Sequence, residues 1–284
     1  MQLIENMPEN EYRSHEAIAA SDLSIFEVNP SLYLWQKEAP RDPKNSAAAD
    51  FGSALHLAVL EPEKFDDQVI VSDLKTKTAK AFVQQQIENP DKYILTEGEA
   101  EQIRFLVKSA RANPMIHKML SMDGSPEVSL FSKCSETGLQ LKIRVDWLIN
   151  YNGEFLPCNL KSTADLSKWR KNQSWVNPLF EFNYGFSAAF YMHAMRSGGM
   201  EVNEHPFICY QKSAQLGRYP ASVFTVTWAE LENLGFVERV KASLQNLKEC
   251  QENNALFLEP ERFGDFGIDE NQIIDCSILD SFGG

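Results

Sequence analysis

The chain has 284 residues, with 27 Lys and Arg against 40 Asp and Glu, so its formal net charge is −13. Hydrophobic residues make up 43% and charged residues 24%, which is normal for a soluble globular protein. This composition excludes a disordered, collagen-like or disulfide-scaffold chain. The negative charge argues against coating of nucleic acid or anionic membrane by the whole surface, although it leaves room for a local basic groove.

The first residues and the cysteines favour a cytoplasmic protein. Residues 1–11 are acidic and polar, without the basic and apolar regions of a signal peptide. No apolar run approaches the roughly 18 residues that span a bilayer. The five cysteines are widely spaced and form no C-x-x-C pair, so neither a zinc ribbon nor a disulfide framework is indicated. We therefore expect reduced thiols and no membrane partner.

The first part of the chain has the pattern of helices. Four are expected, over residues 19–26, 51–60, 79–88 and 97–112. Ser21 or Asp22 can cap the first of them by accepting backbone N–H groups of its opening turn. The segment from Pro40 to Ala49 is rich in proline, charge and alanine and predicts a loop.

The middle of the chain changes to the pattern of strands. Residues 127–132, 139–149 and 155–161 predict a three-stranded meander, followed by a helix over 184–196, strands over 206–212 and 221–227, and a helix over 229–253. This order indicates an α+β or α/β fold with a mixed sheet. We expect one domain over residues 1–264, with a helical lead-in over 1–50 and an acidic tail over 265–284.

Polar residues on neighbouring predicted strands form the main chemical pattern. Asp146 lies on one strand, and Asn159 and Lys161 lie on its antiparallel neighbour, where their spacing of two places both on one face. Glu127 can add a carboxylate from the preceding strand. Mg²⁺ prefers oxygen ligands, and a lysine beside it can orient or deprotonate an attacking water. The pattern predicts a hydrolytic metal site, although such spacing also arises by chance.

Several short motifs, in the same order, resemble the nuclease domain of the exonuclease VIII (RecE) family, over about residues 14–260. They are Phe51-Gly52-Ser53-Ala54-Leu55-His56, Leu60-Glu61-Pro62-Glu63-Lys64-Phe65, Glu136-Thr137-Gly138, Arg144-x-Asp146, Asn159-Leu160-Lys161-Ser162-Thr163-Ala164-Asp165, Ala189-Phe190-Tyr191 and Gly217-Arg218-Tyr219-Pro220. That family belongs to the PD-(D/E)xK nucleases. The resemblance implies a restriction-endonuclease-like core, in which helices flank a central mixed sheet.

The resemblance also implies an activity and partners. It implies an exonuclease that depends on Mg²⁺, with Mn²⁺ as a substitute, and that resects linear duplex DNA from the 5′ end. The remaining 3′ strand would pass to an annealing protein of the RecT type, and the enzyme would form a ring-shaped homo-oligomer around DNA. Among site residues, it implies metal ligation by His56, Glu127, Asp146, Asn159 and the backbone carbonyl of Leu160, and it makes Lys161 the catalytic lysine.

Two positions depart from the family pattern. Asn159 stands where the family has an aspartate, and Ser187 stands where it usually has a glutamine, four residues before Tyr191. An amide keeps one carbonyl oxygen but loses the charge, so it is a poorer Mg²⁺ ligand. Either an introduced substitution or natural loss of activity accounts for Asn159. The intact Lys161 favours the introduced substitution, whereas Ser187 slightly favours natural loss.

DNA contacts are expected from basic and polar residues around this site. The candidates are Lys75, Lys77, Lys80, Arg144, Lys168, Arg170, Lys171, Ser187 and Tyr191. The lysine clusters could follow a phosphate backbone or could simply form a solvated surface. Two other function classes stay open: a nuclease-like protein that holds DNA ends or a recombination partner without cutting, and a phage decoy that binds host nucleases.

Overall fold

The computed structural model describes residues 1–38, 43–77, 80–151, 153–169 and 176–253. The expected tail over 265–284 and two candidate DNA contacts, Arg170 and Lys171, lie outside the described residues. Six strands form one sheet in the order β1-β4-β5-β6-β7-β8, in which only β6 and β7 run parallel. Their bounds are Gln2–Ile4, Gly124–Lys133, Gln140–Tyr151, Glu154–Thr163, Glu204–Gln211 and Ala221–Thr227 for β1, β4, β5, β6, β7 and β8. The predicted meander and mixed sheet are confirmed.

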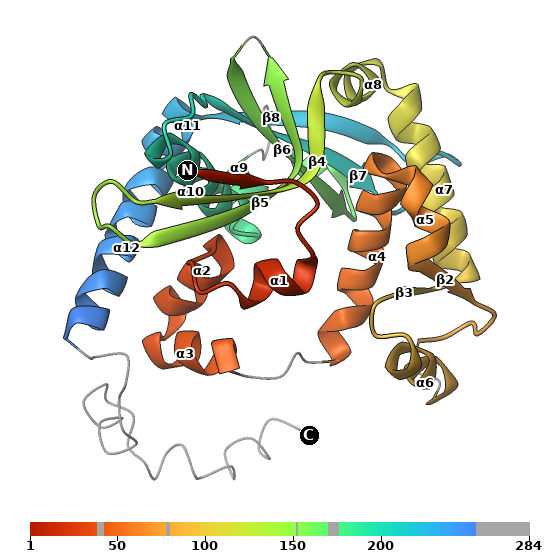
Figure 1. Ribbon diagram of the computed structural model, residues 1–284. Helices are drawn as coiled ribbons and strands as arrows, with labels where there is room; N and C mark the ends of the chain where they lie inside the picture. Colours follow the sequence, from red (N-terminus) through yellow and green to blue (C-terminus); the bar gives the residue numbers. More distant parts are fainter. Residues whose placement is uncertain (39–42, 78–79, 152, 170–175, 254–284) are drawn as a thin grey trace, which may run out of the picture.

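The sheet forks between β5 and β6. These two strands pair only where Trp147–Tyr151 lies opposite Glu154–Cys158. Beyond this stretch, the first half of β5 stays paired with β4, while residues Asn159–Thr163 of β6 run parallel to β7. The two halves of the sheet diverge from this point (Figure 1). Asp146 and Asn159 lie directly beyond the shared stretch.

Helices cover both faces of the sheet (Figure 1). One core cluster joins the sheet to α2 (Ala20–Val28), α10 (Tyr184–Ser197) and α12 (Phe236–Glu252). A second joins the other face to α4 (Pro43–Leu60), α7 (Glu97–Ala112) and α8 (Pro114–Leu120). The remaining elements are α1 (Glu9–Ser14), α3 (Pro30–Glu38), α5 (Pro62–Gln68), α6 (Lys80–Glu88), η1 (Leu166–Trp169), α9 (Val176–Glu181), α11 (Trp228–Asn233) and a parallel pair of strands, β2 (Val69–Ser72) and β3 (Tyr93–Thr96).

A buried lysine of β5 fastens the N-terminal segment to the sheet. The Lys142 side chain is only 5% exposed. Its ammonium group donates to the carbonyl oxygens of Tyr12, Arg13 and His15 at 3.0, 3.1 and 2.7 Å. An ammonium group at the last carbonyls of a helix is favourable, because it satisfies groups that the helix itself leaves unpaired. The expected helical lead-in therefore lies against the sheet, and β1 adds a strand to its edge.

Two expectations about helix length are wrong. Residues 43–49 belong to α4 rather than to a loop. Proline is tolerated at the first helical position and alanine is the strongest helix former, so Pro43 and Ala47–Ala49 favour the longer helix. The expected helix over 229–253 is two helices, because Gly235 takes a left-handed conformation with φ of 80° between α11 and α12.

The expected cap of α2 is also wrong. The first flanking residue is Ala19, not Ser21 or Asp22. Asp22 instead lies in the first turn, where its carboxylate accepts the backbone N–H of Ala19 at 2.9 Å. The acidic side chain thus still stabilises the helix start, but from inside the helix.

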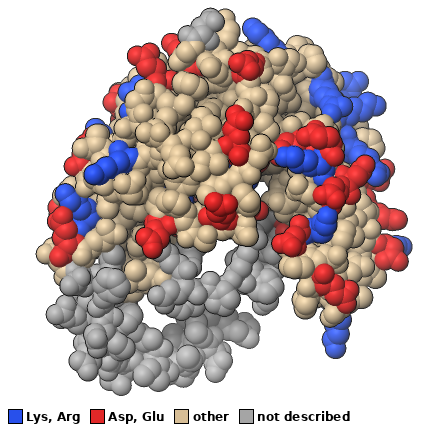
Figure 2. Space-filling model, in the orientation of Figure 1, with Lys and Arg blue, Asp and Glu red and all other residues tan. Residues whose placement is uncertain are grey.

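The described residues can be compared with two properties of the sequence, its lack of a long apolar run and its net negative charge. No described helix is both long enough and apolar enough to cross a membrane. Acidic and basic side chains are scattered over the face shown in Figure 2, except that Lys and Arg gather at one end, over α7 and α8. The strong net negative charge is therefore unevenly distributed.

We expect Gly185→Ala to destabilise the fold through α10. A Cβ atom there would lie 2.3–2.7 Å from ring atoms of Phe236, closer than atoms can pack. Such overpacking costs about 1–3 kcal/mol of unfolding free energy. Gly98→Ala in α7 is the control, because a Cβ atom at Gly98 would meet no other atom within 4 Å. Urea unfolding measures both, and equal midpoints for the two variants would contradict the close approach of α10 and α12.

Candidate metal and nucleic-acid site

The site is built where the sheet forks. Asp146 precedes the stretch of β5 that is shared with β6, and Asn159 is the first β6 residue beyond that stretch. The backbone N–H of Leu160 donates to Asp146 Oδ2 at 2.7 Å. This hydrogen bond crosses the gap that strand pairing leaves open. It holds the Asp146 carboxylate beside β6, the strand that carries Asn159.

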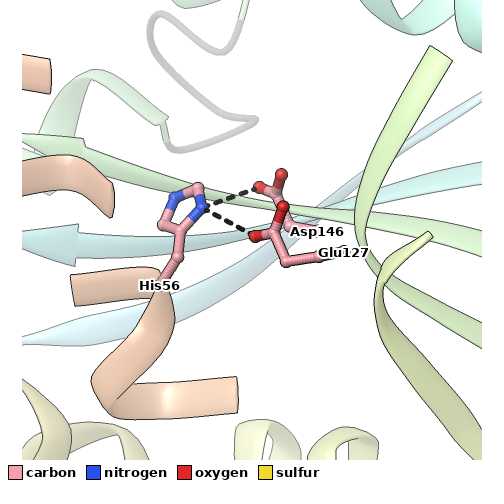
Figure 3. A group of neighbouring side chains, drawn as sticks. All are labelled: His56, Glu127 and Asp146. Atoms are coloured by element: carbon pink, nitrogen blue, oxygen red, sulfur yellow. Dashed lines mark ion pairs between the residues drawn. The ribbon is translucent and has the colours of Figure 1, made fainter. Parts of the chain in front are cut away.

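His56 approaches the two carboxylates from α4. Its Nδ1 atom lies 3.7 Å from Glu127 Oε1 and 3.7 Å from Asp146 Oδ2, and the three side chains point toward one another (Figure 3). Their ligand atoms all lie within 4.8 Å of one another. These separations exceed a hydrogen bond. They suit atoms that share a cation, since two ligands at about 2.1 Å from one ion lie about 3–4 Å apart.

Asn159 adds an unpaired acceptor to this group. Its side chain is 6% exposed, and its Oδ1 atom is buried with no hydrogen-bond partner among the described residues. An unpaired buried carbonyl is costly, so such atoms usually accept from a group that the protein chain does not supply. The donor set of one imidazole, two carboxylates and one amide oxygen fits a divalent cation. This observation supports the predicted ligand role of Asn159.

Glu127 reaches the site through an unusual backbone conformation. Its φ is +48°, a left-handed conformation that non-glycine residues rarely adopt within a strand. The pairing of β4 with β5 is interrupted at this residue. Glu127 Oε2 accepts from Arg144 Nε at 2.8 Å. The strained residue therefore presents one carboxylate oxygen to His56 and the other to Arg144, as strained residues at functional sites often do.

Arg144 keeps a donor without a partner. Its Nη1 atom is buried and makes no hydrogen bond to a described residue. The side chain still lines the cleft beside the metal-binding group. A guanidinium group prefers planar anions such as carboxylate and phosphate. The site thus offers an unpaired acceptor and an unpaired donor in one cleft.

Burial and charge act against each other on the titratable groups. Burial lowers the pKa of His56, but Asp146 and Glu127 more than offset it, so the pKa is raised. Burial raises the pKa of Glu127, but His56 and Arg144 lower it to below its ordinary value. Burial also raises the pKa of Asp146, which His56 and Lys161 only partly offset. The three groups therefore depend on one another for their charge.

Lys161 lies on the face of β6 that α10 covers. Its Nζ atom is 5.4 Å from the centre of the Tyr184 ring. From the same helix, the Tyr191 hydroxyl donates to the carbonyl oxygen of Arg144 at 2.8 Å. Ser187, one turn before Tyr191, is half-buried and also faces the cleft. The helix thus joins both arms of the fork and places an aromatic ring beside the lysine.

A cleft of about 1810 Å³ contains most of the predicted site. Predicted site residues that line it are His56, Glu127, Arg144, Asn159, Lys161, Ser187 and Tyr191. Asp146 is buried beside it. The predicted role of Leu160 was a carbonyl ligand; the structure shows its amide bonded to Asp146 and its side chain in the core.

The described lysines of the predicted clusters do not line this cleft. Among the described residues that line it, none is Lys75, Lys77, Lys80 or Lys168. Lys77 pairs with Glu99 at 2.9 Å, and Lys168 pairs with Glu181 at 3.5 Å. Lys75 and Lys80 are exposed. A DNA contact through these lysines would therefore lie outside the cleft.

Sequence reasoning missed three residues of the cleft wall. Tyr184 carries the ring beside Lys161, and Lys142 fastens the N-terminal wall. His205 also lines the cleft, and burial lowers its pKa to about 3, so its imidazole is neutral. For Lys142 the sequence did contain a signal. Lys142, Arg144 and Asp146 alternate along β5, and every second residue of a strand lies on the same face.

Comparisons with known proteins agree with this architecture. Residues 21–262 match the family described as "PDDEXK-like domain of unknown function (DUF3799)". A crystal structure of a "Putative exonuclease" from Eubacterium rectale is similar over 88% of this chain and 87% of that chain, with a TM-score of 0.55 and 17% identity, which confirms the predicted fold alone. A crystal structure of SSO0001 aligns at 16% identity over 67% of this chain and 84% of that chain, but its TM-score of 0.26 carries no argument. A search of curated proteins finds no significant match.

We expect Tyr191→Phe to lower the unfolding free energy by about 1–3 kcal/mol, because it leaves the Arg144 carbonyl without its hydroxyl donor. Tyr210→Phe is a matched control, since the buried Tyr210 hydroxyl has no hydrogen-bond partner among the described residues. Its removal should be neutral or stabilising. Chemical unfolding measures the difference, and equal losses from both variants would argue against the bond that joins α10 to the fork.

Proposed function

Since the chain belongs to the family of PDDEXK-like domains DUF3799, we propose that it is a Mg²⁺-dependent exonuclease that degrades linear duplex DNA from the 5′ end. The observation that carries this proposal is the pair of unpartnered groups in one cleft. Asn159 Oδ1 is a buried acceptor without a donor, and Arg144 Nη1 is a buried donor without an acceptor, among the residues that the structure describes. A cation and a phosphate oxygen would satisfy both at once.

Each site residue has a defined part in hydrolysis. A bound Mg²⁺ or Mn²⁺ ion would supply Lewis acidity at the scissile phosphate. Glu127, Asp146, Asn159 and His56 would hold that ion. Arg144 would orient a phosphate oxygen through its unpartnered donor, while its other edge stays bonded to Glu127. Lys161 would orient or deprotonate the attacking water and offset negative charge at phosphorus.

The substrate and partners extend the same proposal. The duplex would enter the cleft by its end, and the 3′ strand that survives would pass to an annealing protein of the RecT type. A ring-shaped homo-oligomer would keep the enzyme on DNA. These proposals draw support from the motif resemblance and from the cleft, which lies at the fork of a PD-(D/E)xK-like sheet.

A binding protein without nuclease activity is the second candidate. Asn159 favours it, because replacing a carboxylate by an amide removes one negative charge from the cation site. Against it, Lys161, Asp146 and Glu127 are all present and His56 completes the group. The two candidates differ in what an aspartate at position 159 should do.

We expect Asn159→Asp to strengthen Mg²⁺ binding and to bring 5′-directed hydrolysis of linear duplex DNA. The added carboxylate offers the cation a charged, hard oxygen as a ligand. Calorimetric titration measures the affinity, and an assay with label on the 5′ or the 3′ end measures cutting and its direction. Asn150→Asp is the matched control, because it adds the same charge on β5 but outside the cleft.

Three outcomes would count against the enzyme as proposed. They are nicking of closed circular DNA, equal loss of both strands, and improved metal affinity of Asn159→Asp without any cutting. The last result would favour the binding protein. It would also point to Ser187 as a second position at which a residue needed for cutting has been lost.

We expect Lys161→Ala, placed in the Asn159→Asp protein, to keep Mg²⁺ affinity while lowering the cleavage rate about 10²–10⁴-fold. The lysine acts on water and on developing charge rather than on the ion. Lys133→Ala at the far end of β4 is the control for loss of a lysine. Loss of metal affinity in step with the rate would instead make Lys161 part of the ion's binding site.

A further inference from the structure

Two segments of this acidic chain contain no acidic residue over an unusual length. Residues 102–122 and 205–229 are the longest stretches of the sequence without Asp or Glu. The first contains Arg104, Lys108 and Arg111, and the second contains Arg218. In a chain with net charge −13, such stretches concentrate positive potential if they lie together.

The structure packs these two segments side by side. Gln102 Nε2 donates to the carbonyl oxygen of Lys212 at 2.6 Å, and Asn113 Nδ2 donates to the carbonyl oxygen of Ala221 at 2.9 Å. Between these bonds, α7 runs along the β7–β8 hairpin. Stretches that are about a hundred residues apart in sequence thus form one surface, and the exposed Glu101 lies at its edge, one turn before Arg104.

The cations of this surface point to solvent. Arg104, Lys108 and Arg111 follow a spacing of four and three, which places them on one side of α7. All three are exposed, as is Arg218 on the hairpin. Figure 2 shows Lys and Arg gathered at this end of the molecule, over α7 and α8. By contrast, some lysines elsewhere are paired, as Lys77 is with Glu99 and Lys92 with Asp67.

A stacked pair of aromatic rings, of which Phe105 is exposed and Tyr219 half-buried, belongs to the same two segments. The rings of Phe105 and Tyr219 are nearly parallel, 14° apart in orientation and 5.6 Å apart between centres. Phe105 is 45% exposed, although an apolar ring of this size is ordinarily buried. A flat, half-exposed ring held against a second ring is suited to stacking with a nucleobase.

We propose that this surface binds a single strand of DNA. We call it the α7 face, formed by Arg104, Phe105, Lys108, Arg111, Arg218 and Tyr219. The cations contact phosphates, and Phe105 stacks on a base, which a single strand offers along its length and the interior of a duplex does not. Of these six residues, none lines the cleft. The α7 face is therefore a second DNA site, which holds a strand that the cleft does not enclose.

This inference rests on the proposed function for its choice of DNA as the polyanion. Binding can be measured without cutting, so the two can fail separately. The assay uses the full chain without Mg²⁺ and fluorescence anisotropy of a labelled oligothymidylate of about 16 nucleotides, beside a duplex of equal length. Absence of cleavage by Asn159→Asp would overturn the proposed enzyme and leave the anisotropy result standing.

Charge reversal tests the phosphate contacts. We expect R104E/K108E to weaken single-strand binding about tenfold or more and to reduce the dependence of log affinity on log salt by about 1.4. K241E/K248E on α12 is the control, with the same change in net charge on another surface. Equal weakening by the two double variants would overturn the proposal, because a general repulsion would then explain both.

Removal of the ring tests the preference for a single strand. Phe105→Ala should weaken oligothymidylate binding about tenfold, with little change for duplex DNA, since the bases inside a duplex already stack on one another. Phe105→Trp should keep the affinity. Unfolding midpoints close to that of the parent chain show that the α7 face is intact in each variant. Unchanged single-strand affinity in Phe105→Ala, or equal loss for duplex, would overturn the proposal.

Discussion

The hydrogen bond from the Leu160 N–H to the Asp146 carboxylate is the contact on which the site depends. It lies at the fork, where β5 and β6 stop pairing, and it replaces a ladder bond with a bond to a side chain. Because the carboxylate accepts this bond, Asp146 is fixed in direction although its strand has lost its neighbour. His56 Nδ1 then lies 3.7 Å from this fixed oxygen, and Glu127 completes the group. A site built on diverging strands gains both rigid arms and an opening between them.

The residue types and their order along the chain could be predicted, because they depend on local pattern. The meander and the parallel β6–β7 pair follow from strand-forming segments and from the intervening helix. Asn159 and Lys161 share a face through their spacing of two. The position of His56 could not be obtained in this way, since α4 meets the sheet through packing over long sequence separation. The motif resemblance supplied it.

Other features were beyond sequence reasoning for physical reasons. The left-handed conformation of Glu127 has no sequence signal, because an ordinary residue is held there by surrounding contacts rather than by its own preference. The break at Gly235 has such a signal, yet a continuous apolar pattern obscured it. Lys75, Lys77, Lys80 and Lys168, for which the sequence left a DNA contact open, do not line the cleft. The cations of the α7 face form one surface only when two distant segments are packed together.

Net charge is a poor guide to what the cleft can bind. Much of the charge inside it is already balanced: Arg144 bonds Glu127, Arg13 bonds Glu9, and Lys64 bonds Glu61. The remaining preference comes from a few unpartnered atoms, which select ligands by direction as well as by sign. An acidic protein can in this way offer a phosphate a local environment that its total charge opposes.

The anchoring of the N-terminal segment has a consequence for biosynthesis. The carbonyl of Tyr12 meets Lys142, 130 residues later, and β1 pairs with β4. This segment is synthesised before β4 and β5 and therefore stays without these partners until both strands have been made. Packing of the N-terminal segment against β4 and β5 is a non-local step. The entropy cost of closing this long loop therefore falls late in folding. The cleft thus acquires its final shape only after the strands that carry Glu127 and Asp146 have been synthesised, whatever the order in which the rest of the domain folds.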